Sequence, residues 1–323
     1  MENILVSIHC ATYNHEKYIV DAIESFLMQK TTFKYEILIH DDASTDRTAD
    51  IIREYEKQYP NLIKAIYQTK NQYSQGKSIS TINLKRAQGK YIALCEGDDY
   101  WTDPYKLQKQ LDYMESHPEC SLCVHGGYIV NGIEKKMQTK HRPSRRNKIF
   151  TVEEVIGGGG SLFLTNSMFY PKEYGNIRPP FFDIAPVGDY PTAISLSLLG
   201  SVYYIDEFMS AYRTGVINSW TALNTSTEKQ LVHYSKIAAM LDEIDQYTKG
   251  KYKGAINNRK FQNQFIVLLE QRKFKETKSA KYKEYYRSLS YRQKFVIFLD
   301  QYFPTILQLI RLAKRSWSKW ELR

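Results

Sequence analysis

Along the first 120 residues, short apolar runs alternate with segments in which apolar residues recur at helical spacing. The apolar runs predict strands at 4–10, 36–39, 62–67 and 91–95. The other segments predict helices at 19–27, from Ser44 or Thr45 to about 59, at 79–87 and from about 104 to 116. Strands and helices in this order form a mostly parallel sheet with helices on both faces. We therefore expect an α/β fold.

Beyond residue 122 the pattern loosens. The segment 135–148 holds seven basic residues, one proline and no acidic residue, so we expect a mobile surface loop there. We predict strands at 162–170 and 202–205, a helix at 189–199, and helices from about residue 227 onward. A run of four glycines, 157–160, lies before the first of these strands.

Polar side chains follow three of the predicted strands at the point where each strand ends. The segments are Ala11-Thr12-Tyr13-Asn14 after the first strand, Asp41-Asp42-Ala43-Ser44-Thr45-Asp46 after the second, and Glu96-Gly97-Asp98-Asp99-Tyr100-Trp101 after the fourth. Ligands of parallel α/β sheets bind beyond the carboxyl ends of the strands. Asp and Ser also cap helices, which explains any one of these segments. Three such segments together favour a ligand site.

The segment after the fourth strand is the most informative, because it places two carboxylates, Asp98 and Asp99, next to each other. Adjacent carboxylates at the end of a buried strand repel each other unless a cation neutralises them. Oxygen ligands suit Mg²⁺ or Mn²⁺, and the coordination of such ions is often completed by phosphates of a substrate. The pair therefore predicts that a nucleoside diphosphate binds through a metal ion.

Four motifs occur in the order seen in the family 2 glycosyltransferases, which the chain resembles closely over about 4–120 and more loosely to about 220. They are Thr12-Tyr13-Asn14, Asp41-Asp42-x-Ser44-x-Asp46, Ala87-x-Gly89-Lys90-Tyr91-Ile92-Ala93 and Glu96-Gly97-Asp98-Asp99. The resemblance implies the GT-A fold, a Rossmann-like nucleotide-sugar-binding domain with a mostly parallel central sheet. It implies a domain at 1–222, with a nucleotide-binding half (1–120) and an acceptor half (121–222), followed by a basic helical C-terminal region at 223–323.

The resemblance also implies roles for the residues at the strand ends. Ala11, Thr12, Tyr13 and Asn14 would form one donor-binding segment, in which Tyr13 lies against the nucleotide base. Asp42 would accept a hydrogen bond from the base. Asp98 would lie near the ribose or the metal, and Asp99 would coordinate the metal. The family often has Asp where this chain has Gly97, and Glu96 stands one place earlier. Lys77 would reach the nucleotide, or is a solvated lysine.

For the second half, the resemblance implies that Asp189 is the general base, although an Asp before a helix is also a normal N-cap. Ala211-Tyr212-Arg213 resembles a late segment that often continues to a histidine near the diphosphate, and this chain has no histidine there. Arg213, Asn218 or Trp220 would replace that contact, and Trp101 is a further candidate contact to the diphosphate or the acceptor. The glycine run at 157–160 either lines the acceptor cleft or is a flexible connection.

Charge divides the chain into two parts. Lys and Arg total 45 and Asp and Glu total 35, a formal net charge of +10, but residues 249–323 alone hold 19 basic and 5 acidic residues. Apolar residues recur at helical spacing near the C-terminus, with basic residues between them: Phe303, Ile306, Leu307, Ile310, Ala313, Trp317 and Trp320. Such a helix suits an anionic membrane surface, or packing on the catalytic body or on the partner of a homodimer. No nucleic-acid-binding motif accompanies the basic residues, so we expect no nucleic-acid partner.

Four cysteines in 323 residues do not form a disulfide scaffold, and no run of about 18 apolar residues is present. The start, Met1-Glu2-Asn3, has no basic segment before an apolar one, so we expect no signal peptide. We expect a cytoplasmic protein, at most peripheral on the inner face of the cell membrane.

The reaction implied is inverting transfer of a hexosyl or N-acetylhexosaminyl group from a nucleotide-diphosphate sugar, UDP-linked, with Mn²⁺ or Mg²⁺ as cofactor. The acceptor implied is a hydroxyl of a glycan or lipid-linked glycan in bacterial surface polysaccharide synthesis. The alternatives are a non-catalytic nucleotide- or glycan-binding protein on the same fold and, less favoured, a basic nucleic-acid-binding protein.

Overall fold

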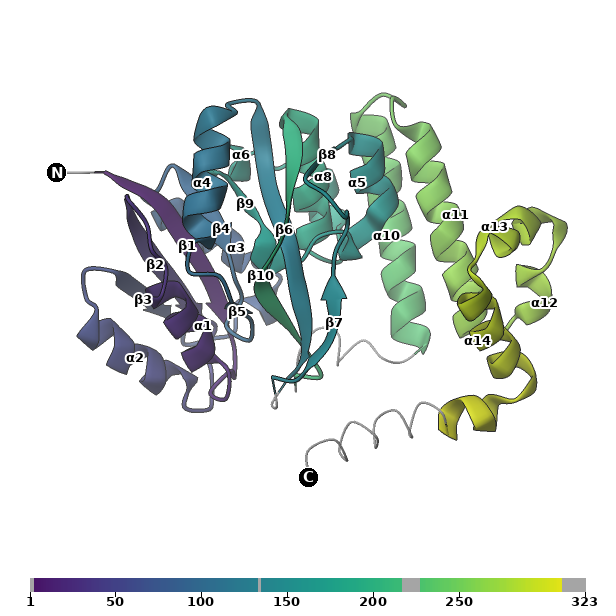
Figure 1. Ribbon diagram of the computed structural model, residues 1–323, viewed down its shortest axis with the longest axis horizontal. Coiled ribbons are helices and arrows are strands. Elements are labelled where there is room, and N and C mark those ends of the chain that lie inside the picture. The colour runs from purple at the N-terminus through teal and green to yellow at the C-terminus, as the bar shows by residue number, and fades with distance from the viewer. Residues whose placement is uncertain (1–2, 133–134, 217–226, 310–323) are drawn as a thin grey trace.

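The computed structural model describes residues 3–132, 135–216 and 227–309. The strands of this part are β1 (Ile4–Thr12), β2 (Lys34–Asp41), β3 (Ile63–Tyr67), β4 (Tyr91–Leu94), β5 (Tyr100–Trp101), β6 (Cys120–Asn131), β7 (Met137–His141), β8 (Lys148–Phe150), β9 (Phe169–Pro171) and β10 (Ser201–Thr214). They form one central sheet in the order β3-β2-β1-β4-β9-β6-β10-β5, with β7 paired to β6 and β8 paired to β10 (Figure 1).

The longer helices are α1 (Ile19–Leu27), α2 (Thr48–Gln58), α3 (Ile79–Arg86), α4 (Lys106–Ser116), α5 (Val152–Gly158), α8 (Asp189–Leu199), α10 (Thr227–Tyr247), α11 (Lys253–Glu270) and α14 (Tyr291–Tyr302). Shorter helices are α6 (Lys172–Gly175), α7 (Phe181–Ile184), α12 (Phe274–Thr277) and α13 (Lys283–Ser288). Every strand and helix predicted before residue 120 is present, with ends that differ by a few residues.

Strands β1 to β4 are parallel, and side chains of opposite faces enter two separate hydrophobic cores. On one face, Ile8 of β1 packs in the same core as Phe26 of α1 and Leu111 of α4. On the other face, Ile92 of β4 packs in a core with Ile194 of α8. The architecture is therefore α/β, with a mostly parallel central sheet that helices cover on both sides.

Three predictions for the second half are wrong in part. The expected loop at 135–148 contains β7, antiparallel to β6, and the start of β8, antiparallel to β10. The side chains of β7 are mostly exposed, so this strand has no apolar alternation to signal it. The strand expected at 162–170 is reduced to β9 (Phe169–Pro171). The residues before it are mostly buried, as in a strand, but they form irregular chain and a 3₁₀ turn (Thr165–Ser167). The strand expected at 202–205 extends to Thr214 through two irregularities that disturb its alternation.

The C-terminal region is helical, as expected, and its first helices pack on the sheet domain. Met240 and Leu241 of α10 are fully buried and belong to the same core as Val155 of α5 and Ile194 of α8. Figure 1 shows α10 and α11 side by side next to α5, with α12 to α14 beyond them. The division of the chain at residues 222 and 223 stays a prediction, and α10 shares the core of the preceding domain.

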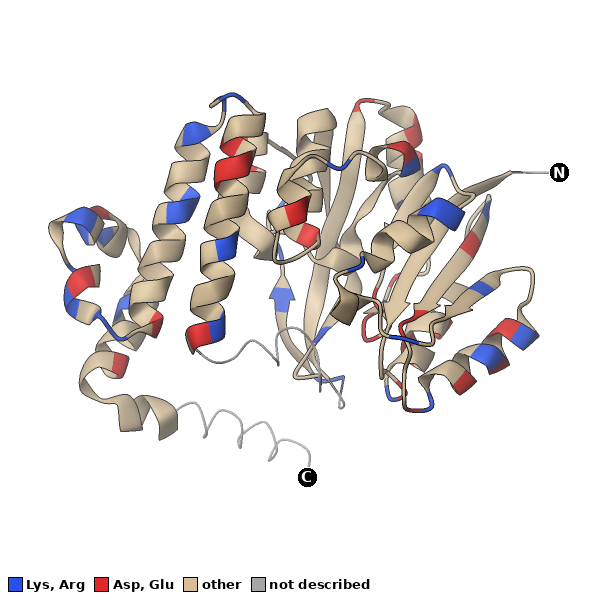
Figure 2. Cartoon of the chain, turned by 180° about the vertical axis from the view of Figure 1, so that it is seen from behind, with Lys and Arg blue, Asp and Glu red and all other residues tan. Residues whose placement is uncertain are grey.

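The basic residues of this region are spread along its helices. Figure 2 shows several blue positions along α11 and in the short helices after it, whereas α10 carries red positions as well. Within the described residues, no helix combines the length and the hydropathy that a membrane crossing requires. The part of the predicted amphipathic segment from residue 310 onward lies outside the described residues.

Candidate active site

The ends of β1, β2 and β4 meet at one edge of the sheet, because these three strands are parallel neighbours. The backbone N–H of Asp42 donates a hydrogen bond to the carbonyl of Thr12 (2.9 Å), and that of Gly97 donates to the carbonyl of Ala11 (2.8 Å). The three polar segments that the sequence analysis singled out therefore form one surface beyond the sheet.

Polar side chains of the second segment fasten it to the first. Asn14 adopts a left-handed backbone conformation (φ 56°), its N–H donates to Oγ of Ser44 (2.9 Å), and its Oδ1 accepts from the N–H of Thr45 (2.8 Å). Oδ2 of Asp46 accepts from the N–H of Glu16 (3.1 Å). Asn14, which we predicted to bind the donor, therefore links the two loops, and the Ser44 and Asp46 positions of the motif serve the same purpose.

Asp42 holds a third loop against this surface. Its buried carboxylate accepts hydrogen bonds from the backbone N–H groups of Gln72 (2.6 Å, to Oδ1) and Tyr73 (3.0 Å, to Oδ2). Nζ of the exposed Lys77 donates to the side chain of Gln72 (2.9 Å), so the lysine lies on this loop. Tyr13 is 37% exposed at the end of β1 and offers a free aromatic face. The roles of Tyr13, Asp42 and Lys77 toward a nucleotide stay predictions.

The two adjacent carboxylates after β4 have different surroundings. Asp99 is buried, and its oxygens accept hydrogen bonds from Nδ2 of Asn166 (2.9 Å) and from the backbone N–H of Arg213 (2.8 Å). Burial, together with the charges of Asp98 and Glu96, holds the pKa of Asp99 well above its ordinary value. Asp98 is only partly buried, and its Oδ2 lies 3.9 Å from Nε2 of His15. The geometry therefore favours Asp98 over Asp99 as the residue that meets a ligand.

Gly97 allows the ends of β1 and β4 to come this close. A Cβ atom at this position would lie 2.6 Å from Oγ1 of Thr12 and 3.1 Å from Nδ1 of His15. Both distances are shorter than ordinary van der Waals contacts. The Asp that the family often has at this position would therefore not fit here without a shift of the first loop.

Arg213 joins the loop after β4 to helix α1. Its guanidinium pairs with the carboxylate of Asp21 and donates to the carbonyl oxygen of Asp98 (2.5 Å). The group lies 4.6 Å from the ring centroid of Tyr100, and the side chain has no exposed surface. In this structure the buried Arg213 side chain positions Asp98, and its predicted contact with a diphosphate stays a prediction.

Asp189 and Tyr212 lie close to the carboxylates that follow β4. The pKa of Glu96 is raised to about 8. The main cause is loss of water around its carboxyl group, although part of the side chain faces solvent, and the charges of Asp98 and Asp189 add to the shift. Burial and then the charges of Asp99, Glu96, Asp98 and Asp189 raise the pKa of the Tyr212 phenol. Because such effects weaken with distance, Asp189 and Tyr212 lie near the carboxylates that follow β4. From the sequence, Tyr212 stands out only as part of the motif Ala211-Tyr212-Arg213.

Asp189 is the first residue of α8, and the N-cap position belongs to Gly188. No side-chain capping bond is formed there, and Oδ1 of Asp189 accepts a hydrogen bond from the N–H of Tyr190 (2.7 Å). Burial raises the pKa of the Asp189 carboxyl group. A partly buried carboxylate with a raised pKa is suited to accept a proton.

Comparison with known sequences identifies the family. The sequence pattern described as Glycosyl transferase family 2 matches residues 7–170. The chain belongs to glycosyltransferase family 2.

Two relatives illustrate how far the likeness of this family 2 member extends. An uncharacterized protein of Mycobacterium tuberculosis is 33% identical over 230 residues, which is 69% of this chain and 63% of that protein. The chain thus matches a little under two thirds of this relative's length. TuaG of Bacillus subtilis, which is named as a glycosyltransferase of teichuronic acid biosynthesis, is 40% identical over 213 residues, covering 65% of this chain and 79% of TuaG.

Solved structures share the fold. S. aureus TarS in complex with UDP-GlcNAc superposes with a TM-score of 0.59 at 17% identity, covering 92% of this chain and 79% of that one. The mannosyltransferase PcManGT from Pyrobaculum calidifontis, in complex with GDP-Man and Mn²⁺, superposes with a TM-score of 0.56 at 14% identity, covering 98% and 88%. This likeness concerns the fold, and it confirms the GT-A fold expected from the motifs.

The remaining predicted contacts of this family 2 member lie elsewhere. Trp101 is buried, and its Nε1 donates to the backbone carbonyl of Asn166 (2.9 Å), so it is a core residue here. Asn218 and Trp220 lie outside the described residues. The glycine run ends α5 and forms a 3₁₀ turn, and a Cβ at Gly159 (φ 70°) would meet the guanidinium of Arg259 from α11. The run is therefore a packing site for the C-terminal helices.

A metal ion is expected in this family 2 fold, and the residues at the strand ends fit one that is shared with a diphosphate. In the described part of the chain, no three His, Cys, Asp or Glu side chains are grouped so that they could hold a metal ion. Asp98 and His15 form a pair of donors, 3.9 Å apart. A pair suits an ion that takes its other ligands from substrate phosphates and water.

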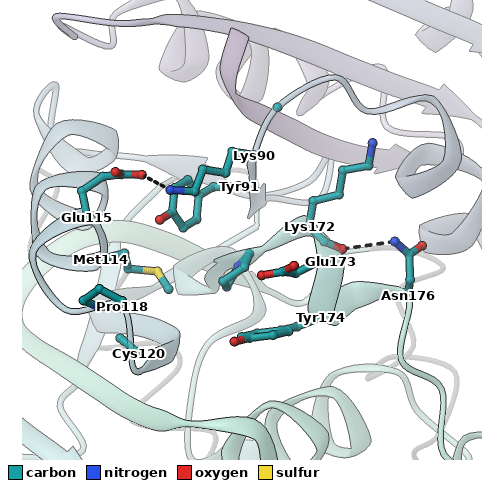
Figure 3. Close-up of a pocket in the computed structure, with 12 residues that line it drawn as sticks. Lys90, Tyr91, Met114, Glu115, Pro118, Cys120, Lys172, Glu173, Tyr174 and Asn176 are labelled. Atoms are coloured by element: carbon teal, nitrogen blue, oxygen red, sulfur yellow. Dashed lines mark hydrogen bonds and ion pairs between the residues drawn. The ribbon is translucent and has the colours of Figure 1, made fainter. Parts of the chain in front are cut away.

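A cavity lies at the opposite end of β4 from these residues. Its lining includes Tyr91, Glu115 and Tyr174, and Lys90 forms an ion pair with Glu115 at its rim (2.8 Å) (Figure 3). It contains no residue of the motifs that follow the strands. The cavity is thus separate from the candidate active site.

Proposed function

We propose that the chain is an inverting glycosyltransferase that transfers a sugar from a nucleoside-diphosphate sugar to a hydroxyl group of a glycan. The observation that supports the proposal is that Asp189, at the start of α8, lies near enough to Glu96, two residues before Asp98, for its charge to raise the pKa of Glu96. Membership of family 2 supports the reaction class. One end of the cleft then binds the diphosphate, and the other end activates the acceptor.

Asp189 acts as the general base. Its carboxylate accepts the proton of the acceptor hydroxyl as that oxygen forms a bond to the anomeric carbon of the donor sugar. The bond between the anomeric carbon and the diphosphate oxygen breaks on the opposite face, and the nucleoside diphosphate leaves with the electron pair. Attack from the face opposite the leaving group inverts the configuration. The raised pKa of Asp189, caused by burial, improves its match to a proton at neutral pH.

The donor is a nucleotide sugar, and we assign uridine as its base. Tyr13, with its exposed ring at the end of β1, stacks on the base, and the loop that Asp42 holds covers the base edge. The UDP-GlcNAc named for TarS supports a uridine donor, whereas the GDP-Man named for PcManGT shows that this fold also accepts guanosine. The sugar is of the hexosyl or N-acetylhexosaminyl type.

Asp98, with His15 beside it, holds a divalent ion, Mn²⁺ or Mg²⁺. The ion, when bound, supplies positive charge that stabilises the leaving diphosphate. The protein's own part is to fix Asp98 through the hydrogen bond from Arg213 to its carbonyl oxygen. The Mn²⁺ named for PcManGT supports this assignment.

The acceptor is a glycan or lipid-linked glycan of bacterial surface polysaccharide synthesis, a setting that the name of TuaG supports. Tyr291, Phe295, Phe298 and Tyr302 of α14 are exposed, and Arg292 and Lys294 lie among them. Aromatic and basic side chains together suit an anionic membrane surface, where a lipid-linked acceptor resides. The enzyme then acts on the cytoplasmic face.

A screen of nucleotide sugars for hydrolysis and transfer in the presence of Mn²⁺ tests the proposal. We expect turnover with at least one UDP-sugar, reduced at least about 1,000-fold in Asp189→Asn, because Asn cannot accept the proton. Asp183→Asn is the matched control, since Asp183 is an exposed residue of the preceding helix α7. Specific nucleotide binding without turnover would instead support a non-catalytic binding protein.

A further inference from the structure

The imidazole of His15 lies beside the carboxylate of Asp98. Its Nε2 lies 3.9 Å from Oδ2 of Asp98, and each side chain is 13% exposed. Nδ1 of the same ring is buried and lacks a hydrogen-bond partner within the described residues. At 3.9 Å the contact of Nε2 with Asp98 is too long for a hydrogen bond, so in the described part of the chain no hydrogen bond of Nδ1 or to Asp98 explains the position of the ring.

The backbone on both sides holds this pair in place. The N–H of His15 donates to Oγ1 of Thr48 (2.8 Å), and its carbonyl oxygen accepts from the N–H groups of Tyr18 and Ile19 at the start of α1 (2.8 Å each). The ring also packs edge-on against Tyr18. Because the Asp98 carbonyl is held by Arg213, neither side chain sits on a free loop.

We propose that His15 and Asp98 together ligate the divalent ion of the donor complex, with His15 Nε2 as the nitrogen ligand. Oδ2 of Asp98 and Nε2 of His15 face each other 3.9 Å apart, so these two side chains would hold a divalent ion that takes its other ligands from the diphosphate and water. Mg²⁺ prefers a shell of oxygen ligands and water, whereas an imidazole nitrogen favours a transition-metal ion. The pair therefore selects Mn²⁺ over Mg²⁺. This inference rests on the proposed nucleotide-sugar site.

The test is Mn²⁺ binding to the full chain in the presence of UDP, followed by electron paramagnetic resonance. We expect the wild type to show the ¹⁴N coupling of a bound imidazole, which changes to ¹⁵N coupling when the histidines are ¹⁵N-labelled. In His15→Ala we expect this ¹⁴N coupling to disappear and the Kd for Mn²⁺ to rise about tenfold or more. The preference of the site for Mn²⁺ over competing Mg²⁺ should become smaller. The control is His117→Ala, because His117 stacks on Tyr113 at the end of α4.

The outcomes separate this inference from the proposed function. Asp98→Asn should abolish Mn²⁺ binding. If it does so while His15→Ala keeps wild-type Kd, the role of His15 is wrong and the donor site stands. The role of His15 as a metal ligand would also be wrong if the wild type shows no ¹⁴N coupling and His15→Ala only weakens the binding of UDP without metal. If neither the wild type nor any variant binds Mn²⁺ with UDP, the proposed function fails as well. The label exchange in the wild type needs no mutant, so a His15→Ala protein that fails to fold does not prevent the test.

Discussion

The amide of Asn166 holds the carboxylate of Asp99 inside the protein. Nδ2 of Asn166 donates to Oδ2 of Asp99 (2.9 Å), and its Oδ1 accepts from Oγ of Ser210 on β10 (2.7 Å). With these bonds Asp99 is buried, whereas the side chain of Asp98 is 13% exposed. The support of the loop after β4 thus comes in part from Asn166, a residue of the second half of the chain.

Removal of the Asn166 side chain should destabilise the fold. In Asn166→Ala the buried Asp99 and Ser210 lose a partner, and we expect the free energy of unfolding to fall by about 2–3 kcal/mol. Urea unfolding of the wild type and the variant measures this difference in free energy. The exposed Asn176 bonds only weakly to a carbonyl (3.5 Å), so Asn176→Ala should change stability by less than about 0.5 kcal/mol. Equal effects of the two variants would contradict the role of Asn166.

Gly97→Ala should separate the ends of β1 and β4. The new methyl group would meet Oγ1 of Thr12 at 2.6 Å, which we expect to cost about 1–3 kcal/mol of stability. The variant should also bind UDP with Mn²⁺ more weakly, because His15 and Asp98 move apart. Gly254→Ala is the control, since a methyl group there, near the start of α11, meets no atom within 4 Å. We expect that variant to be as stable as the wild type, or slightly more so.

Asp42→Ala should loosen the loop at 71–77. The backbone N–H groups of Gln72 and Tyr73 lose their acceptors, so cleavage by trypsin after Lys70 or Lys77 should become severalfold faster. Limited proteolysis with mass spectrometry measures these rates. Asp50→Ala, at an exposed position on α2, should leave them unchanged. Unchanged cleavage in Asp42→Ala would leave the carboxylate only its predicted role toward the base.

Lys106 should make stability depend on pH. It is fully buried, its Nζ donates to Gln110 (2.7 Å), and burial lowers its pKa to about 7. Because an unfolded lysine keeps its proton up to about pH 10.4, unfolding takes up a proton between about pH 7 and 10, and this group's contribution to stability rises with pH there. Relative to Lys106→Met, the wild type should gain about 1.4 kcal/mol per pH unit above pH 7.

Urea unfolding of both proteins at pH 7 and 8.5 tests this difference, in which the contributions of other groups cancel. Lys109→Met, on the same helix, is the control. Partial burial lowers the pKa of Lys109, but its ion pairs with Asp103 and Glu207 outweigh this and raise the pKa overall, so Lys109 keeps its proton over this pH range. Its difference from the wild type should not vary with pH over this range. A constant difference for Lys106→Met would mean that Lys106 stays charged in the folded protein.

The helix α10 should prove to be part of the catalytic body. Leu241 is fully buried in the core shared with α5 and α8, so Leu241→Ala should lower the free energy of unfolding by about 2–5 kcal/mol. Val232→Ala, on the same helix but 51% exposed, should cost less than about 0.5 kcal/mol. A separate, early transition in Leu241→Ala would support an independent unit that begins at residue 223.

The first half of the fold was predictable because each of its elements has a local signature. Ile8 and Ile37 lie in short apolar runs of the kind that buried strands have, and Phe26 and Ile52 lie in segments whose apolar residues recur at helical spacing. The exposed strand β7 has no such period, and only its pairing with β6 holds it in the sheet. Its hydrogen-bond partners lie on another strand, so local sequence carries no signal for it.

The sequence by itself predicted where the candidate site lies, because parallel strands end at one edge and the polar segments follow those strands. It named Asp98, Asp99 and Asp189, but only the tertiary structure decided which of these carboxylates are buried. Asp99 is turned inward by Asn166 and by the backbone of Arg213, which lies 114 residues away in the chain. His15 meets Asp98 only because β1 and β4 are neighbours in the sheet. Such encounters depend on which strands lie side by side and on which residues are small enough, like Gly97, to let them approach, and neither is written in local sequence.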